Sequence, residues 1–128
     1  ASGGELSRIG LAIFTLTSRN TSVPTLIFDE VDSGVGGATG EVVGRMMKQL
    51  GQTRQVLCVT HLPQVAACGD HHLKVEKVSD GIETVSLREL NPTQRVEEIA
   101  RMLGGLLITQ KTKVLAEEMV KANLSQEE

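Results

Sequence analysis

A short apolar segment that ends in two adjacent carboxylates constrains this chain most. Residues 25–28 read Thr-Leu-Ile-Phe, Asp29 and Glu30 follow directly, and a glycine-rich turn comes next. A short apolar run bounded by turn residues is typical of a buried parallel strand. In open α/β sheets, ligands bind outside the carboxyl ends of such strands. We therefore expect a strand over 25–29 that delivers both carboxylates to a site.

Two carboxylates at a strand end suit a metal ion and an activated water. Adjacent strand residues point to opposite faces, but the backbone turns where the strand ends, so Asp29 and Glu30 can approach one site. One carboxylate can hold Mg²⁺ while the other orients and deprotonates an attacking water, as hydrolysis of a nucleoside triphosphate requires. A solvated strand end with a helix-capping acid is the structural alternative to this catalytic interpretation.

Composition excludes several classes of function. With 128 residues, 40% of them hydrophobic and 23% charged, the chain is a globular domain or part of one. It has no Trp or Tyr, which argues against a base-stacking platform for single-stranded nucleic acid. Its net charge of −3 argues against a self-sufficient electrostatic binder of DNA. Cys58 and Cys68 form no metal pattern and indicate buried, reduced thiols. No apolar run suggests a membrane span or a signal peptide, so we expect a cytoplasmic protein without a membrane partner.

Apolar periodicity and turn residues predict the other elements. A second buried strand is expected over 55–60, and Ser79-Asp80-Gly81 indicates a hairpin between two alternating segments. The expected helices begin near Ser2, cover 38–50, start at Pro63, cover 94–103 and run from about 109 to 123. A loop is expected over 20–24 and a polar, frayed tail over 125–128. The predicted fold class is α/β, with a mostly parallel sheet, helices and an antiparallel hairpin.

The first predicted helix offers an anion site at its start. Ser2, Gly3, Gly4 and Glu5 fit a capping box, so Ser2 is the candidate N-cap. Glycines before a helix expose backbone N–H groups at the positive end of its dipole, where a phosphate can bind. The Ser2 hydroxyl could add a donor, although an ordinary helix start is the simpler interpretation. The apolar stripe of this helix is formed by Leu6, Ile9, Ile13 and Leu16.

A histidine follows the second predicted strand. Thr60-His61 lies at that strand's carboxyl end, and therefore at the sheet edge expected to carry Asp29 and Glu30. A lone histidine is more often structural, but an imidazole at this edge could donate a hydrogen bond to a γ-phosphate. We interpret His71 and His72 as surface residues.

The turn after the paired carboxylates contains Asp32, Ser33 and Gly34. This turn can be a simple loop. It can also be a place where another subunit approaches closely, because glycine offers no side-chain obstacle.

Together these pieces resemble the ABC-type ATPases, and most closely a bacterial DNA repair ATPase of their SMC-like branch. The order matches the signature motif, the Walker B strand, the D-loop and the switch histidine of that family. The matching segments are residues 1–8, 26–32, 59–66 and 100–105. The run His-Leu-Pro-Gln-Val-Ala from His61 and the late Leu-Gly-Gly separate the chain from transporter ATPases, a weaker alternative within the enzyme class.

The resemblance implies roles for the residues at the sheet edge. Asp29 would bind the Mg²⁺ shell, Glu30 would be the general base and His61 would sense the γ-phosphate of ATP. In the family, ATP joins two heads into a dimer and hydrolysis releases them during repair of double-strand breaks, with DNA bound through the full-length protein.

The resemblance also implies contacts with a second head. Ser2, Gly3 and Gly4, with Glu5 of the same motif, would bind nucleotide held by the opposing head. The head–head interface would include the D-loop residues Asp32, Ser33 and Gly34.

One departure from the family pattern limits the expected activity. The chain contains no G-x-x-x-x-G-K-[ST] phosphate loop; its nearest glycine-rich stretch, 36–41, has no Lys. Residues 1–128 therefore look like the C-terminal lobe of a split ATPase head, inactive until an N-terminal half supplies the phosphate loop. A sheet without that half would leave an unpaired edge and an uncovered apolar face. A non-catalytic dimerisation or partner-docking module of the same fold is the alternative from another class.

Overall fold

The computed structural model describes residues 2–17 and 22–124. Its elements, in chain order, are α1 (Gly3–Thr17), β1 (Thr25–Phe28), α2 (Gly37–Gly51), β2 (Gln55–Cys58), α3 (Pro63–Ala66), β3 (Leu73–Ser79), β4 (Glu83–Glu89), α4 (Pro92–Gly104) and α5 (Gln110–Leu124). Each predicted helix and strand is present. The predicted tail and residues 20 and 21 of the predicted 20–24 loop lie outside the described residues.

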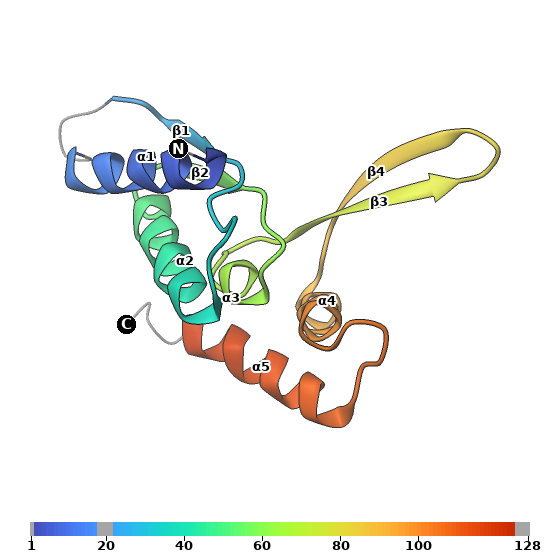
Figure 1. The fold of residues 1–128 in the computed structure, drawn as a ribbon. Helices are drawn as coiled ribbons and strands as arrows, with labels where there is room; N and C mark the ends of the chain where they lie inside the picture. Colours follow the sequence, from blue (N-terminus) through green and yellow to red (C-terminus); the bar gives the residue numbers. More distant parts are fainter. Residues whose placement is uncertain (1, 18–21, 125–128) are drawn as a thin grey trace.

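The strands form two separate pairs. β1 and β2 are parallel, with Leu26 opposite Val56 and Phe28 opposite Cys58, whereas β3 and β4 are antiparallel. The hairpin of β3 and β4 projects from the body as an arm (Figure 1). The predicted α/β fold with a parallel sheet and an antiparallel hairpin is therefore confirmed.

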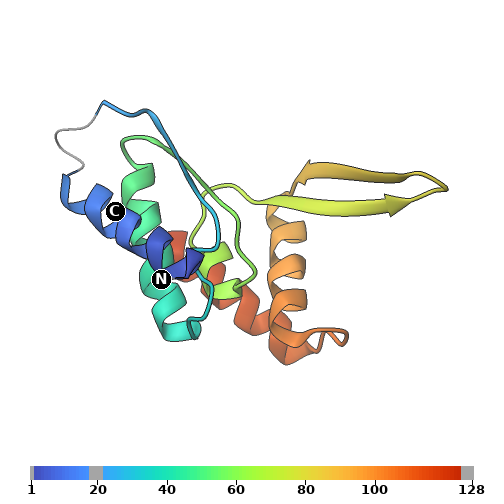
Figure 2. The same cartoon turned by 45° about the horizontal axis from the view of Figure 1, so that its top comes forward.

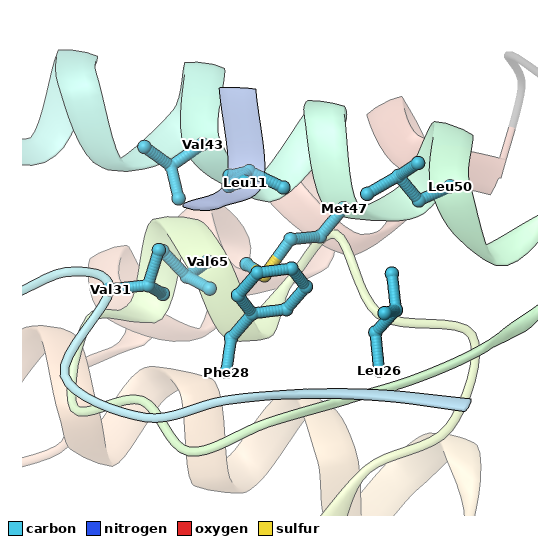
Figure 3. Packing of buried hydrophobic residues seen from close by; sticks show 8 residues of the cluster. All are labelled: Leu11, Leu26, Phe28, Val31, Val43, Met47, Leu50 and Val65. Carbon is cyan, nitrogen blue, oxygen red and sulfur yellow. The ribbon is translucent and has the colours of Figure 1, made fainter. Parts of the chain in front are cut away.

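The main core lies between the parallel strands and α2. Leu26 and Phe28 alternate with exposed residues along β1 and point toward Val43, Met47 and Leu50 of α2 (Figure 3). Each buried side chain of this size stabilises the fold by about 2 kcal/mol relative to exposure. This packing holds the carboxyl end of β1 at a defined place above α2.

The prediction that β1 and β2 are buried is correct for only one face of the parallel sheet. Ile27 is 71% exposed, Leu57 is 41% exposed and Val59, just after β2, is 63% exposed. Side chains alternate between the two faces of a strand. In the part of the chain that the structure describes, helices cover only the face that carries Leu26 and Phe28. The apolar run in the sequence therefore reflects two apolar faces of the parallel sheet. Helices cover one of these faces in the described part of the chain.

The packed face of α1 also differs from its apolar stripe. The helix buries Gly4 and Leu11. The stripe at helical spacing is exposed: Leu6 59%, Ile9 54%, Ile13 55% and Leu16 85%. Residues four and eleven share a face because they are about two turns apart, and this face is the one in contact with the core. Spacing alone could not show which of the two faces would be buried.

The C-terminal half has its own small core and polar joints. Ile99 and Ala100 of α4 pack with Ala116 of α5. The buried Glu98 side chain forms an ion pair with Lys74, with 2.9 Å between Glu98 Oε2 and Lys74 Nζ. This ion pair connects α4 to the base of the hairpin. Figure 2 shows the hairpin extending sideways from the start of α4. None of the helices described is long and apolar enough to span a bilayer.

Candidate functional site

The loop that follows β1 rests on the first turns of α1. Ser7 Oγ donates a hydrogen bond to the Asp29 carbonyl oxygen at 2.7 Å. Arg8 Nη1 donates to the carbonyl oxygens of Val31 at 3.2 Å and Ser33 at 2.7 Å. The Arg8 guanidinium thus hydrogen-bonds the backbone on both sides of Asp32. Because Leu11 of α1 packs in the main core, these hydrogen bonds connect the loop to that core.

Glu30 occupies an unusual backbone conformation. Its φ of 58° lies in the left-handed region that residues other than glycine rarely adopt. The turn is closed by a hydrogen bond from Ser33 N to Glu30 O at 3.0 Å. Such conformations cost free energy and concentrate at functional sites. The conformation turns the chain sharply after Asp29, and the side chains of Asp29 and Glu30 are both exposed.

The glycines at the start of α1 allow the loop to approach. A Cβ atom on Gly4 would lie 2.8 Å from Ser33 Cβ and 2.9 Å from Glu30 O. A Cβ atom on Gly3 would meet the Glu30 carboxylate. Ser2 is the N-cap, as predicted, since Glu5 N donates to Ser2 Oγ at 3.2 Å. The structure therefore brings the helix start and Glu30 together.

Asp32 is buried and faces its own chain. It is only 2% exposed, and its Oδ2 accepts hydrogen bonds from the Thr60 hydroxyl, from His61 N at 3.0 Å and from Leu62 N at 3.3 Å. Burial alone would raise the pKa of Asp32, but the hydrogen bonds from Thr60 and His61 outweigh it and hold that pKa below its usual value. Asp32 is therefore an ionised acceptor for this loop.

His61 lies beside Asp32 at the same end of the sheet as the paired carboxylates. Its Nδ1 is 3.2 Å from Asp32 Oδ2, while its side chain is 71% exposed. The backbone of Val59 donates to Phe28 O at 3.0 Å, which keeps the ends of β1 and β2 adjacent. The sequence placed His61 at this edge but gave no sign of its contact with Asp32. Ser33 and Gly34, also expected at an interface, are exposed.

The carboxylates suit Mg²⁺ better than an ion that needs a protein cage. Among the described residues, no group of three or more His, Cys, Asp or Glu side chains is arranged to hold a metal ion. Mg²⁺ is usually held by one or two carboxylates together with water and substrate phosphates. Asp29 and Glu30, exposed at one turn, match that limited requirement.

The burial of His72 and Cys58 differs from what the sequence predicted. His72 is half-buried rather than on the surface, and burial lowers its pKa. Cys58 is half-buried rather than fully buried; burial raises the pKa of its thiol to about 12, and Asp32 and Asp29 add to the effect. Cys68 is buried as expected, and burial raises its thiol pKa. Both cysteines are thus protonated and poorly nucleophilic.

Sequence reasoning missed the residues that hold the site together. Ser7, Arg8 and Thr60 had no predicted role, yet each hydrogen-bonds the loop of 29–33. A signal existed for two of them, because Ser7 and Arg8 lie three and four residues after Gly4 and so share its helix face. No local signal marks Thr60, whose partner is 28 residues away.

Comparisons with known proteins show which sequences the chain is similar to. The chain is 50% identical to the DNA repair protein RecN of Vibrio cholerae over 123 residues, which are 95% of this chain and 22% of that protein. It is 52% identical to the RecN of Haemophilus influenzae over 121 residues, 94% of this chain and 22% of that protein. For the RecN of Bacillus subtilis the identity is 44% over 122 residues, 94% of this chain and 21% of that protein. The chain thus spans about a fifth of the length of these relatives.

A solved structure shows the same fold. It comes from work on ATP-driven dimerization and DNA-stimulated activation of SMC ATPases. The TM-score is 0.60 with 21% identity, over 84% of this chain and 65% of that one. No family model matches the chain.

Proposed function

This chain is related to the RecN proteins along nearly its whole length, and we propose that residues 1–128 form the C-terminal lobe of an SMC-type ATPase head in a DNA repair protein. The observation that supports this most is the convergence of the helix start, the paired carboxylates and His61 at one end of the parallel sheet. The motifs that resemblance links to nucleotide hydrolysis meet there through hydrogen bonds between elements far apart in sequence.

The roles within the head are those that the resemblance to SMC-type ATPases implies, and the chemistry of each side chain suits its role. Asp29 would hold Mg²⁺, and the bound ion would supply neutralisation of the negative charge on the phosphates of ATP. Glu30 is the general base that takes a proton from the attacking water. His61 faces the γ-phosphate with an exposed ring and serves as its sensor.

Other residues act across a dimer of heads. The first turn of α1, with Ser2, Gly3, Gly4 and Glu5, binds nucleotide held by the second head, where the positive end of the helix dipole favours a phosphate. Asp32, Ser33 and Gly34 lie at the contact between heads; Ser33 and Gly34 are exposed, whereas the Asp32 side chain is buried. ATP then joins the heads, and hydrolysis separates them.

The other lobe of the head is the first partner. The outer face of β1 and β2 is apolar and exposed at Ile27, Leu57 and Val59. Exposed contiguous apolar surface of this kind marks a contact site. We assign it to the N-terminal half of the same head, which supplies the phosphate loop that the chain lacks. DNA is bound by the whole protein, in the cytoplasm, during repair of double-strand breaks.

The test of this function is the Glu30→Gln variant of the complete head, assembled with its N-terminal half. Loss of the general base should lower the rate of ATP hydrolysis at least about 100-fold, while ATP binding measured by calorimetry is retained. Glu83→Gln, at the exposed start of β4, is the matched control and should hydrolyse ATP normally. Native hydrolysis by Glu30→Gln would show that Glu30 is not the base, and a native head without ATPase activity would refute the proposed function.

A further inference from the structure

The helix α5 has two apolar faces that differ in burial. On one face Ala116 is fully buried, and Met119 and Val120 pack beside it in the small core shared with α4. On the other face Val114 is 44% exposed and Leu115 is 45% exposed. In Figure 1 this helix (red) runs along the lower edge of the molecule. Two large apolar side chains therefore face outward at the margin of the fold.

The outward face has the spacing of a surface that pairs with another helix. Lys111, Val114, Leu115 and Glu118 are three or four residues apart, so they share one side of α5. Together with Gln110 they line an open hollow of about 280 Å³, and each lining residue belongs to α5. In helix packing, the side chains of one helix fill the grooves between the side chains of the other. The hollow can receive a second helix in this way.

The charges at the two ends of this face are opposite. Lys111 and Glu118 are both exposed, and neither forms an ion pair with a described residue. They are seven residues apart, about 10 Å along the helix axis, which is too far for them to pair with each other. The face is thus positive at one end, apolar in the middle and negative at the other end. Such a face is complementary to a copy of itself that runs in the opposite direction.

We propose that this face of α5 is a contact surface for a second copy of the chain, with the two α5 helices antiparallel about a two-fold axis. Lys111 of each copy lies opposite the second copy's Glu118, and Val114 lies opposite the second copy's Leu115. A two-fold interface makes each of these contacts twice. A parallel pairing would instead place like charges together. The contact is separate from the contact between heads at α1 and residues 32–34, and it requires no nucleotide.

The size of the surface sets the strength of the contact. Residues 111–118 form about two turns of helix, whereas a stable interface buries about 800 Å² of each partner. We therefore expect a weak pairing that exchanges rapidly and adds to the other contacts of a larger assembly.

The test is sedimentation velocity over a series of concentrations, without nucleotide. The chain carries Ile27→Thr and Leu57→Thr, so that the exposed face of the parallel sheet does not dominate association. Lys111→Glu and Glu118→Lys each turn two attractive charge pairs into two repulsive ones, so each alone should weaken association about 10-fold. An equimolar mixture of these two variants has both attractive pairs again, with the signs exchanged. The mixture should associate as strongly as the chain without charge reversal.

Lys113→Glu is the matched control. It makes the same change of charge as Lys111→Glu, at an exposed position on a different side of α5. Association should be unchanged in this variant.

Recovery in the mixture also shows that both charge-reversed chains are folded. The proposal is overturned if the chain with Ile27→Thr and Leu57→Thr is monomeric at every concentration, or if the mixture does not recover. An equal loss in Lys113→Glu and Lys111→Glu would overturn it too. A complete head without ATPase activity whose charge-reversed variants associate only when mixed would refute the proposed function and support this contact.

Discussion

Gly4 is a residue of the site at which a side chain would collide with backbone atoms. The first turn of α1 and the loop after β1 meet there without room for a side chain, since a Cβ would approach Glu30 O to 2.9 Å. Glu30 O also accepts the hydrogen bond that closes the turn. We expect Gly4→Ala to displace Glu30, to destabilise the fold and to lower ATP hydrolysis by the complete head.

The matched control is Gly10→Ala on the same helix. A Cβ there meets nothing within 4 Å, so the better helix propensity of alanine should stabilise the fold by about 1 kcal/mol. Urea unfolding and steady-state hydrolysis compare the two variants. Equal behaviour of Gly4→Ala and Gly10→Ala would contradict the packing of the helix start on the loop.

Two buried carboxylates should make stability depend on pH. Burial raises the pKa of Asp32 and of Glu98, but hydrogen bonds from Thr60 and from Arg101 respectively outweigh it, so both pKa values are lowered in the folded state. In acid, the unfolded chain therefore binds more protons at these two carboxylates than the folded chain does. Their stabilisation is present above the unfolded pKa values of about 4 and is lost as pH falls through the lower folded values.

The measurement is urea unfolding as a function of pH. The free energy of unfolding should fall between about pH 5 and pH 3, and the fall should be smaller in Glu98→Gln, which cannot titrate. Because burial lowers the pKa of the half-buried His72, the unfolded chain also binds more protons at this residue. His72 therefore adds a further loss of stability on acidification, which begins at a higher pH than the loss from the carboxylates. Stability that rises on acidification would refute this account.

At the scale of elements, α4 shows how local signals and tertiary contacts combine. Asn91 caps it with a reciprocal capping box, in which its side chain accepts from Gln94 N at 2.8 Å and its N–H donates to Gln94 Oε1 at 3.0 Å. Arg95 then reaches back to the carbonyl oxygens of Ala66 at 3.1 Å and Ala67 at 3.2 Å, at the end of α3. The helix is thus defined locally and placed by a distant partner.

The cap predicts the effect of a single substitution. Asn91→Ala removes the side-chain acceptor and should destabilise the fold by about 1 kcal/mol, measured by urea unfolding. Asn91→Ser retains an acceptor and should cost less than Asn91→Ala. Equal losses in both variants would mean that the cap contributes nothing beyond the shape of the turn.

The elements also show where prediction from sequence succeeds. Helices and strands were predictable because caps, turn residues and apolar spacing are local. The buried face of α1 was not, because the stripe of Leu6 and Ile13 and the face of Gly4 and Leu11 both recur at helical spacing. Contact with the core, which no local pattern encodes, selects the second face.

At the scale of the whole molecule, the uncovered face of the parallel sheet dominates behaviour in solution. Ile27 and Leu57 are paired neighbours on β1 and β2 and both are exposed. We expect the isolated chain to self-associate through this face. Ile27→Thr combined with Leu57→Thr should reduce self-association, since it lowers the apolar area and places threonine, a β-branched residue that favours strands, at both positions.

Sedimentation velocity of the isolated chain measures this effect. Val42→Thr, which lowers the exposed apolar area on α2 instead, is the control and should leave self-association unchanged. If both variants associate like the native chain, the sheet face is not the contact surface.

The sequence by itself determined the element order, the α/β class and the candidate residues Asp29, Glu30 and His61, because each depends on local pattern or on position at a strand end. Only the tertiary structure decided what Asp32 does. Its partners are Arg8 on one side, through the flanking backbone, and residues 60–62 on the other. Such contacts depend on how α1, β1 and β2 pack, and packing brings together residues whose separation in sequence carries no periodic signal.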